Sequence, residues 1–275
     1  MRRRNNRRWA AALCVLAVFA CALTGAAIRL RARRLPLVIE VMAQEDKALP
    51  AAAQAQPGQP RVLIYHTHTW EAYEMTPDAR YTETETWRTR DERFNMVRVG
   101  RALAAEMEAQ GFFVVHDTTA FEPPRLADAY VRSLEMINRR LAAGEVYDYV
   151  IDVHRDAYSG PYNGGNTVDA GGAEMAYVML LVGKGTGATG AGFDERPDWP
   201  RNLELAQAIT DEMDALVPGM AREVKIKTGR FNQHVCSGAM LIEVGNNRNT
   251  LAEALAACPV IAQAIARAHA QRAAQ

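Results

Sequence analysis

The stretch that decides the fold is VLIYHTH, at residues 62–68, in which an apolar run of strand-forming residues ends in ionisable side chains. The pattern recurs as YVIDVH at residues 149–154 and as MLIEVG at residues 240–245. Short apolar runs separated by helical patterns are typical of buried parallel strands. Open α/β sheets place their functional sites at the carboxyl ends of such strands. The sequence therefore predicts that two imidazoles and a carboxylate meet at one edge of a sheet.

The segments between these runs have the periodicity of helices and of further strands. Apolar residues recur at helical spacing from Met96 to Met107, and Gly111 is placed to end that helix before a strand at residues 112–115. Further helices are expected at residues 126–141, 202–216 and 250–270, and a further strand at residues 176–182. Strands that alternate with helices predict an α/β fold, here a single three-layer domain with a mostly parallel central sheet flanked by helices.

The amino-terminal part differs from the rest in composition. Its first 34 residues hold nine Arg and no acidic residue, whereas the remaining residues hold 23 basic and 32 acidic side chains. An uncharged stretch of 20 residues, from Trp9 to Ile28, is long enough to cross a bilayer as a helix. We therefore expect a cytoplasmic basic tip and a transmembrane signal anchor at residues 1–34. A cleavable signal peptide is the alternative, because small residues follow at positions 24–27.

The rest of the chain divides into a linker and a catalytic domain. Residues 35–60 include an Ala/Gln/Pro-rich run without helical or strand periodicity, which predicts a linker. Residues 61–275 are long enough for one α/β domain with a full core. Because this part of the chain is acidic, nucleic acid is not expected as a partner.

Residues at the strand ends are candidates for metal chemistry. The candidate metal ligands are His154 and the pair His66 and His68, which point to the same face of a strand. A carboxylate such as Glu243 in an apolar strand is costly to bury unless it is paired or lies in a polar cleft. The alternative for Glu243 is a structural salt bridge with Arg230 or Arg248. Two imidazoles and a carboxylate ligand suit zinc, and a second, free carboxylate beside the metal suits a hydrolase.

Six ordered segments also carry a family resemblance. From about residue 61 to the carboxyl terminus, the chain resembles the stage II sporulation protein P family in the segments YHTHT (65–69), NMVRVG (95–100), DVHRDA (152–157), NLELA (202–206), RFNQ (230–233) and IEVG (242–245). The resemblance implies a membrane-anchored protein of the zinc N-acetylmuramoyl-L-alanine amidase group. It places the protein in the cell membrane as a single-pass protein, with its catalytic domain outside the cytoplasm.

The resemblance also implies a substrate and partners. The substrate would be peptidoglycan, cut at the amide between N-acetylmuramic acid and L-alanine, in septal wall remodelling during sporulation and engulfment. The implied partners are a lytic transglycosylase and a membrane scaffold. Two alternatives stay open: a peptidoglycan cross-link endopeptidase, and a non-hydrolytic protein that binds cell wall or activates a partner.

Laid on the motifs of that group, the resemblance makes His68 and His154 zinc ligands and Glu243 the catalytic carboxylate. The third ligand stays open between two acidic residues. Asp91 lies four residues before Asn95, as the ligand Glu of the group does, and Glu71 lies three residues after His68.

Three polar residues are candidates for supporting roles. Arg155 is expected to orient Glu243 or to hold a substrate carboxylate. Asn232 and Gln233 are expected to bind peptide or sugar amides of the substrate. The alternative for this Asn-Gln pair is a role in the structure of the loop.

Overall fold

The computed structural model describes residues 55–158, 165–185 and 199–274. These residues belong to one compact unit that runs from Ala48 to Gln275. The expected membrane anchor at residues 1–34, and most of the expected linker, lie outside the described residues.

A six-stranded sheet forms the centre of this unit, in the order β2-β1-β3-β8-β6-β7. Its strands are β1 (Arg61–Tyr65), β2 (Phe113–His116), β3 (Tyr149–Asp156), β6 (Val178–Gly183), β7 (Ala221–Lys227) and β8 (Ala239–Asn246). Strands β2, β1, β3 and β8 run parallel, whereas β6 is antiparallel to β8 and parallel to β7. The expectation of a mostly parallel sheet is confirmed.

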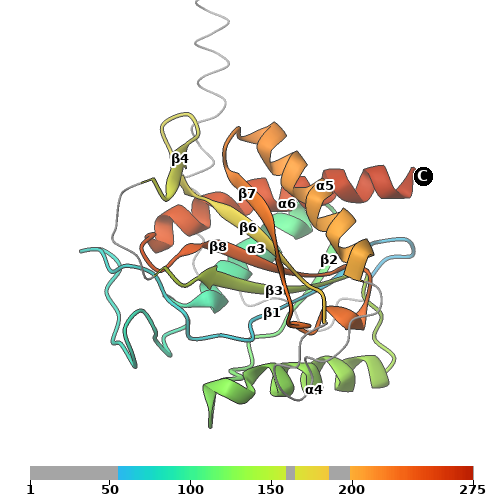
Figure 1. The fold of residues 1–275 in the computed structure, drawn as a ribbon, viewed down its shortest axis with the longest axis horizontal. Coiled ribbons are helices and arrows are strands. Elements are labelled where there is room, and N and C mark those ends of the chain that lie inside the picture. The colour runs from blue at the N-terminus through green and yellow to red at the C-terminus, as the bar shows by residue number, and fades with distance from the viewer. Residues whose placement is uncertain (1–54, 159–164, 186–198, 275) are drawn as a thin grey trace, which may run out of the picture. The chain divides into compact units, whose positions relative to one another are not determined.

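Helices cover both faces of the sheet. The helices α3 (Met96–Ala109), α5 (Trp199–Leu216) and α6 (Leu251–Ala273) lie on one face, and α4 (Ala129–Ala142) lies on the other, as Figure 1 shows. Shorter elements are the 3₁₀ turns η1 (Leu126–Asp128) and η2 (Gln233–Val235) and a hairpin of β4 (Thr167–Asp169) and β5 (Glu174–Ala176). This arrangement confirms three layers.

Local sequence signals set the ends of the helices. The side chain of Asn95 accepts a hydrogen bond of 3.0 Å from the backbone N–H of Val97 and caps the start of α3. Gly111 follows the end of α3 with a φ of 93°, a conformation that favours glycine. Thr250 and Glu253 form a capping box at the start of α6.

Among the described residues, α6 is the one helix whose length and composition would suit a membrane span. It packs against α3 and α5, and 61% of its apolar window is buried inside the fold. A buried core helix passes the same test, so packing accounts for its apolar character.

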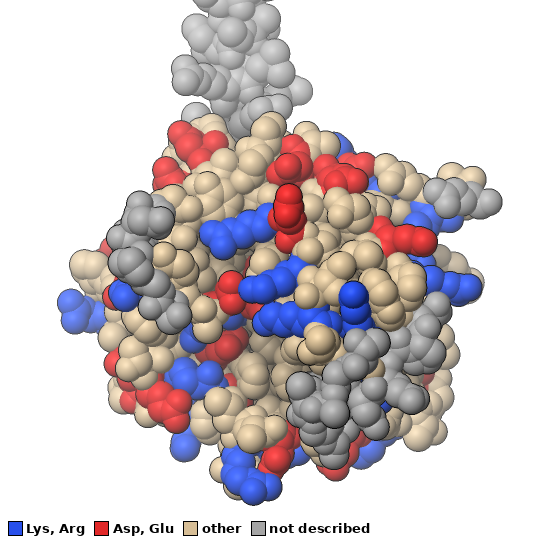
Figure 2. Space-filling model, viewed as in Figure 1, with Lys and Arg blue, Asp and Glu red and all other residues tan. Residues whose placement is uncertain are grey.

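Strand β7 was not predicted from the sequence. It forms one edge of the sheet, and its Arg222, Lys225 and Lys227 side chains are exposed. Basic side chains gather over β7 on the face shown in Figure 2. Charges on an edge strand discourage pairing with other chains, and they hide the apolar pattern that identifies buried strands. The predicted strand at residues 176–182 begins later, at Val178, because Ala176 ends β5.

The strand register places one set of side chains under α4. Leu63, Val150 and Ala239 belong to the hydrophobic cluster on that face, together with residues of α4. Successive side chains of a strand point to opposite faces of the sheet. His154, four residues after Val150, and Glu243, four residues after Ala239, therefore face α4 as well. The candidate site lies on this face.

We predict that Gly100→Ala destabilises the fold. A Cβ at this position of α3 would lie 2.4 Å from Nε2 of His66 and 2.6 Å from Nε2 of His116. The two imidazoles are held, since their Nε2 atoms are 2.8 Å apart and Nδ1 of His66 bonds to the carbonyl of Val153. The free energy of unfolding in urea should fall by about 1–3 kcal/mol, although Ala favours helix more than Gly does.

The matched control is Glu108→Ala, at an exposed position of the same helix. It should change the free energy of unfolding by no more than about 0.5 kcal/mol. A Gly100→Ala variant as stable as the wild type would show that the two imidazoles can move aside.

Candidate active site

The pairing of β3 with β8 brings two of the candidate residues together. His154 is in register with Glu243 on the neighbouring parallel strand. Both side chains are buried, with 3% and 8% of their surface exposed. An imidazole and a carboxylate that lie far apart in the sequence thus become neighbours near the carboxyl ends of their strands.

His68 completes a pair of imidazoles packed against an aromatic ring. The ring centroids of His68 and His154 are 5.2 Å apart, and their planes are close to perpendicular, at 85°. Tyr130 of α4 stacks on His154 at 6.3 Å and meets the edge of His68 at 5.6 Å. Sequence reasoning did not identify Tyr130, because only the packing of α4 on the sheet brings it to the imidazoles.

Glu71 lies beside His154, whereas Asp91 does not. Oε2 of Glu71 is 3.6 Å from Nδ1 of His154. Burial by itself would raise the pKa of Glu71, but a hydrogen bond with His154 and the charge of Arg155 outweigh it and lower the pKa to about 2. The carboxylate of Asp91 instead pairs with Arg93, at 2.6 Å, in the turn that precedes α3. The geometry therefore favours Glu71 as the acidic member of the cluster.

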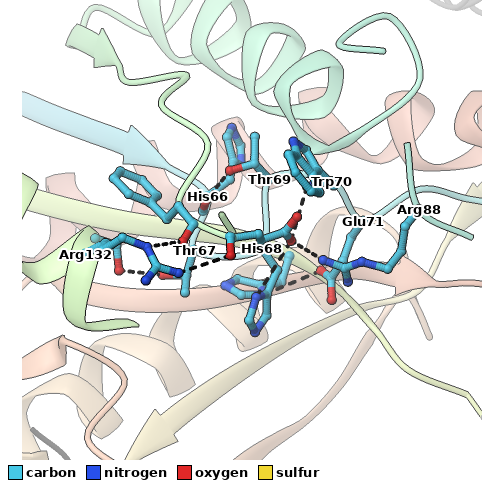
Figure 3. Close-up of polar contacts among 12 residues, drawn as sticks. His66, Thr67, His68, Thr69, Trp70, Glu71, Arg88 and Arg132 are labelled. Carbon is cyan, nitrogen blue, oxygen red and sulfur yellow. Dashed lines mark hydrogen bonds and ion pairs between the residues drawn. The ribbon is translucent and has the colours of Figure 1, made fainter. Parts of the chain in front are cut away.

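Arg155 binds Glu71 and the backbone near it. The expectation that Arg155 orients Glu243 is not what the structure shows. Its Nε donates to the carbonyl of Ala72 at 2.9 Å, and its Nη2 donates to the carbonyl of Trp87 at 3.1 Å. Its Nη1 also lies 3.8 Å from Oε1 of Glu71. The buried guanidinium thus fixes the position of Glu71. Figure 3 shows Glu71 close to His68 on the segment that follows β1.

Asn232 and Gln233 bind the protein itself. The amide of Gln233 accepts from the N–H of Gly183 at 2.9 Å and donates to the carbonyl of Leu181 at 2.7 Å. The Nδ2 of Asn232 donates to Ser133 and to a backbone carbonyl of α4. Both side chains are buried. These bonds fit the structural alternative and leave neither amide directed at a substrate.

His68 has a second acidic neighbour that sequence reasoning missed. Oε1 of Glu122 lies 3.9 Å from Nδ1 of His68 and forms an ion pair with Arg88, which Figure 3 shows in the same cluster. Burial lowers the pKa of His68 to about 4. His68 is therefore neutral at physiological pH, which is the form that binds a metal ion.

Glu243 has a different environment from the other acidic residues. Its Oε2 is buried and has no hydrogen-bond partner among the described residues. Arg248, one of the salt-bridge partners considered for it, lies 3.6 Å from Glu74 instead. Burial raises the pKa of Glu243 to about 7. Glu243 lines a small pocket together with Tyr177, Met179 and Arg222. A carboxyl group with a pKa near 7 can take up or release a proton close to neutral pH.

The types of donor atom in this cluster, imidazole nitrogen and carboxylate oxygen, suit a zinc ion. Among the described residues, no three His, Cys, Asp or Glu side chains converge on a ready-made metal position. However, Nδ1 of His68 is buried without a hydrogen-bond partner in this part of the chain. The ring of His154 lies 5.2 Å from that of His68, and Glu71 lies beside His154. Two imidazoles and one carboxylate are the ligand set of many catalytic zinc sites. In the type of their donor atoms, though not in the arrangement seen here, His68, His154 and Glu71 match this ligand set.

The fold and the site together define an α/β domain with a histidine–carboxylate site at the carboxyl edge of its sheet. The chain belongs to the stage II sporulation protein P family, whose family model matches residues 36–266. This match confirms the resemblance found in the sequence. The chain is 26% identical over 222 residues to stage II sporulation protein P of Bacillus subtilis (strain 168). The aligned region covers 76% of this chain and 51% of that protein. The chain thus spans about half the length of this relative.

Solved structures of amidases resemble the fold at low identity. The CwlD amidase of Clostridioides difficile, in complex with the GerS lipoprotein, has a TM-score of 0.48 and 12% identity, over 78% of this chain and 99% of that chain. The catalytic domain of CwlV, an N-acetylmuramoyl-L-alanine amidase of Bacillus (Paenibacillus) polymyxa var. colistinus, has a TM-score of 0.45 and 13% identity, over 78% and 99% of the two chains. At these values neither likeness carries an argument about activity.

We predict that Glu243→Gln changes how the stability of the metal-free protein depends on pH. The pKa of Glu243 is about 7 in the folded protein, against 4.5 as its ordinary value. A raised pKa of a carboxyl group adds stability below pH 4.5, and this stability is lost as pH rises through about 7. In urea unfolding, the wild type should lose about 2.5 kcal/mol relative to Glu243→Gln between pH 5 and pH 8.

The matched control for this titration is Glu135→Gln, at an exposed position of α4. Its stability should follow that of the wild type at both pH values. If wild type and Glu243→Gln respond to pH in parallel, the carboxylate of Glu243 is not buried as the structure shows.

We also predict that Gln233→Leu destabilises the fold. The substitution would leave the N–H of Gly183 and the carbonyl of Leu181 without their partner inside the protein. Each lost partner costs about 1–3 kcal/mol when the group stays buried, so urea unfolding should show a loss in this range or above. Gln207→Leu, on the exposed face of α5, should have a smaller effect. If the two substitutions lower the free energy of unfolding equally, the structural role of Gln233 is contradicted and Gln233 is again a candidate for binding substrate.

Proposed function

We propose that this protein is a zinc-dependent peptidoglycan hydrolase that cleaves the amide between N-acetylmuramic acid and L-alanine. Membership of the stage II sporulation protein P family supports a role in the cell wall during sporulation. The observation that carries the proposal is the buried carboxylate oxygen Oε2 of Glu243, which has no hydrogen-bond partner among the described residues. Glu243 is in register with His154 on the neighbouring strand. Such a group is costly to keep in a fold unless a reaction uses it.

His68, His154 and Glu71 would hold the zinc ion. A zinc ion bound there supplies a Lewis acid that polarises the amide carbonyl and makes water easier to deprotonate. The guanidinium and the backbone N–H of Arg155 keep Glu71 in place for this task. Tyr130 covers one face of His154 and limits the access of bulk water.

Glu243 would act as the proton carrier. Its raised pKa, about 7, allows the carboxylate to take a proton from the attacking water at neutral pH. The same group, once protonated, gives the proton to the nitrogen of L-alanine as the carbon–nitrogen bond breaks. An amine leaves far more easily with this proton than as an anion.

The expected anchor extends this proposal to the location of the enzyme. The uncharged stretch at residues 9–28 would hold the protein in the cytoplasmic membrane, with the domain on the outer side, where peptidoglycan lies. A lytic transglycosylase and a membrane scaffold are proposed partners by family resemblance alone.

The proposal is tested by digestion of intact sacculi with the full-length, zinc-loaded chain, followed by mass spectrometry of the products. Peptide stems released from sugar chains are the expected products. Glu243→Gln should bind zinc but release no stems. Cross-links cut with stems still attached to sugar would identify an endopeptidase, and zinc binding without products would favour a non-hydrolytic protein that binds cell wall or activates a partner.

A second experiment decides whether Glu71 or Asp91 is the third zinc ligand. We predict that Glu71→Gln weakens zinc binding by at least about tenfold, because a neutral amide is a poorer ligand than a carboxylate. Asp91→Asn is the matched control, since it removes an acidic charge that pairs with Arg93 and should leave zinc affinity unchanged. Competition with a chromophoric chelator measures both. The reverse ranking would restore Asp91 as the ligand.

A further inference from the structure

Asp152 carries a completely buried carboxylate in the middle of the sheet. None of its surface is exposed, and it lies on β3 two residues before His154. Tyr65 of β1 is its partner in register. A charged group in such a place is unfavourable unless several donors stabilise it.

Two donors of one residue hold this carboxylate. The N–H of Thr67 donates to Oδ1 of Asp152 at 2.8 Å, and Oγ1 of Thr67 donates to Oδ2 at 2.6 Å. The Oγ1 of Thr67 also lies 2.9 Å from Oγ of Ser133, on α4. The carboxylate is therefore fixed by the segment between β1 and the candidate ligand His68.

Oδ1 of this fixed carboxylate faces His154. It lies 2.9 Å from Nε2 of His154, although off the direction of an ideal hydrogen bond. On the other side of the ring, Nδ1 of His154 lies 3.6 Å from Oε2 of Glu71. The imidazole thus sits between two carboxylates. Both charges act on the pKa of the neighbouring His68, and that of Glu71 has the larger effect.

We propose that Asp152 is a positioning residue that keeps the proton on Nε2 of His154 and so directs Nδ1, on the side of Glu71, toward the metal ion. This inference rests on the proposed function, because it needs zinc to bind at His154. Imidazoles that bind metals commonly donate their other N–H to a carboxylate, which sets the orientation of the ring. Asp152 is built for this role because Thr67 holds it rigidly.

A purely structural role for Asp152 makes different predictions. If Asp152 only linked β3 to the segment that follows β1, its two hydrogen bonds with Thr67 would be sufficient. Loss of Asp152 would then lower stability without changing how His154 binds a metal. A positioning role predicts instead that zinc affinity falls in protein that is still folded. It also predicts that the protonation of the ring nitrogens changes.

The test compares Asp152→Asn with Asp148→Asn in the full-length chain. Asp148 is exposed and accepts a hydrogen bond from the N–H of Arg61 just before β3, so it provides the same substitution away from the site. Zinc affinity is measured by chelator competition, and folding by circular dichroism. Asp152→Asn should weaken zinc binding by about 10–100-fold, while Asp148→Asn should leave it unchanged.

The second measurement is nitrogen NMR of the zinc-loaded protein labelled at histidine. In the wild type, the signal of His154 should show a protonated Nε2, and Asp152→Asn should alter or broaden it. Wild-type affinity and an unchanged His154 signal in Asp152→Asn would overturn the proposal. A loss of affinity as large as in His154→Ala would also overturn it, since Asp152 would then be a ligand itself.

A variant of Thr67 keeps the proposal testable if Asp152→Asn does not fold. Thr67→Val preserves shape but removes the Oγ1 donor to Asp152. It should weaken zinc binding in the same direction but by less, and unchanged affinity would contradict the proposal. A wild-type chain that neither binds zinc nor releases peptide stems would instead refute the proposed function, so the two failures are distinguishable.

Discussion

The parallel pairing of β3 with β8 is the constraint on which the site depends. Because His154 stands in register with Glu243, the two side chains share the face of the sheet that α4 covers. A shift of one residue in this register would turn one of them toward the opposite face. The apolar residues that alternate with them, such as Val153 and Ile242, are completely buried and resist that shift.

Similar acidic side chains acquire different properties in this site because their neighbours differ. Glu71 lies between His154 and Arg155, and its pKa falls to about 2, which keeps it charged. Glu243 has the same chemistry, but its burial is not offset by such partners, and its pKa rises to about 7. One carboxylate is thus suited to hold a cation and the other to carry a proton.

The parts of the fold that could be predicted are those with a strong local signal. The period of α3 and its glycine stop, and the apolar runs of β1, β3 and β8, identify these elements without any tertiary information. Strand β7 could not be predicted in this way, because its outward charges interrupt the apolar pattern. Its pairing with β6 at the sheet edge, rather than its composition, makes it a strand.

The sequence by itself determined the class of fold and the family. It also indicated that His68, His154 and Glu243 lie near the strand ends, because residues at strand ends are positioned by the strands that carry them. Only the tertiary structure separated Glu71 from Asp91, since the path of the loop after β1 brings Glu71 to His154 while Asp91 turns toward Arg93. The tertiary structure likewise gave Arg155, Asn232 and Gln233 internal partners, which no spacing along the chain reveals.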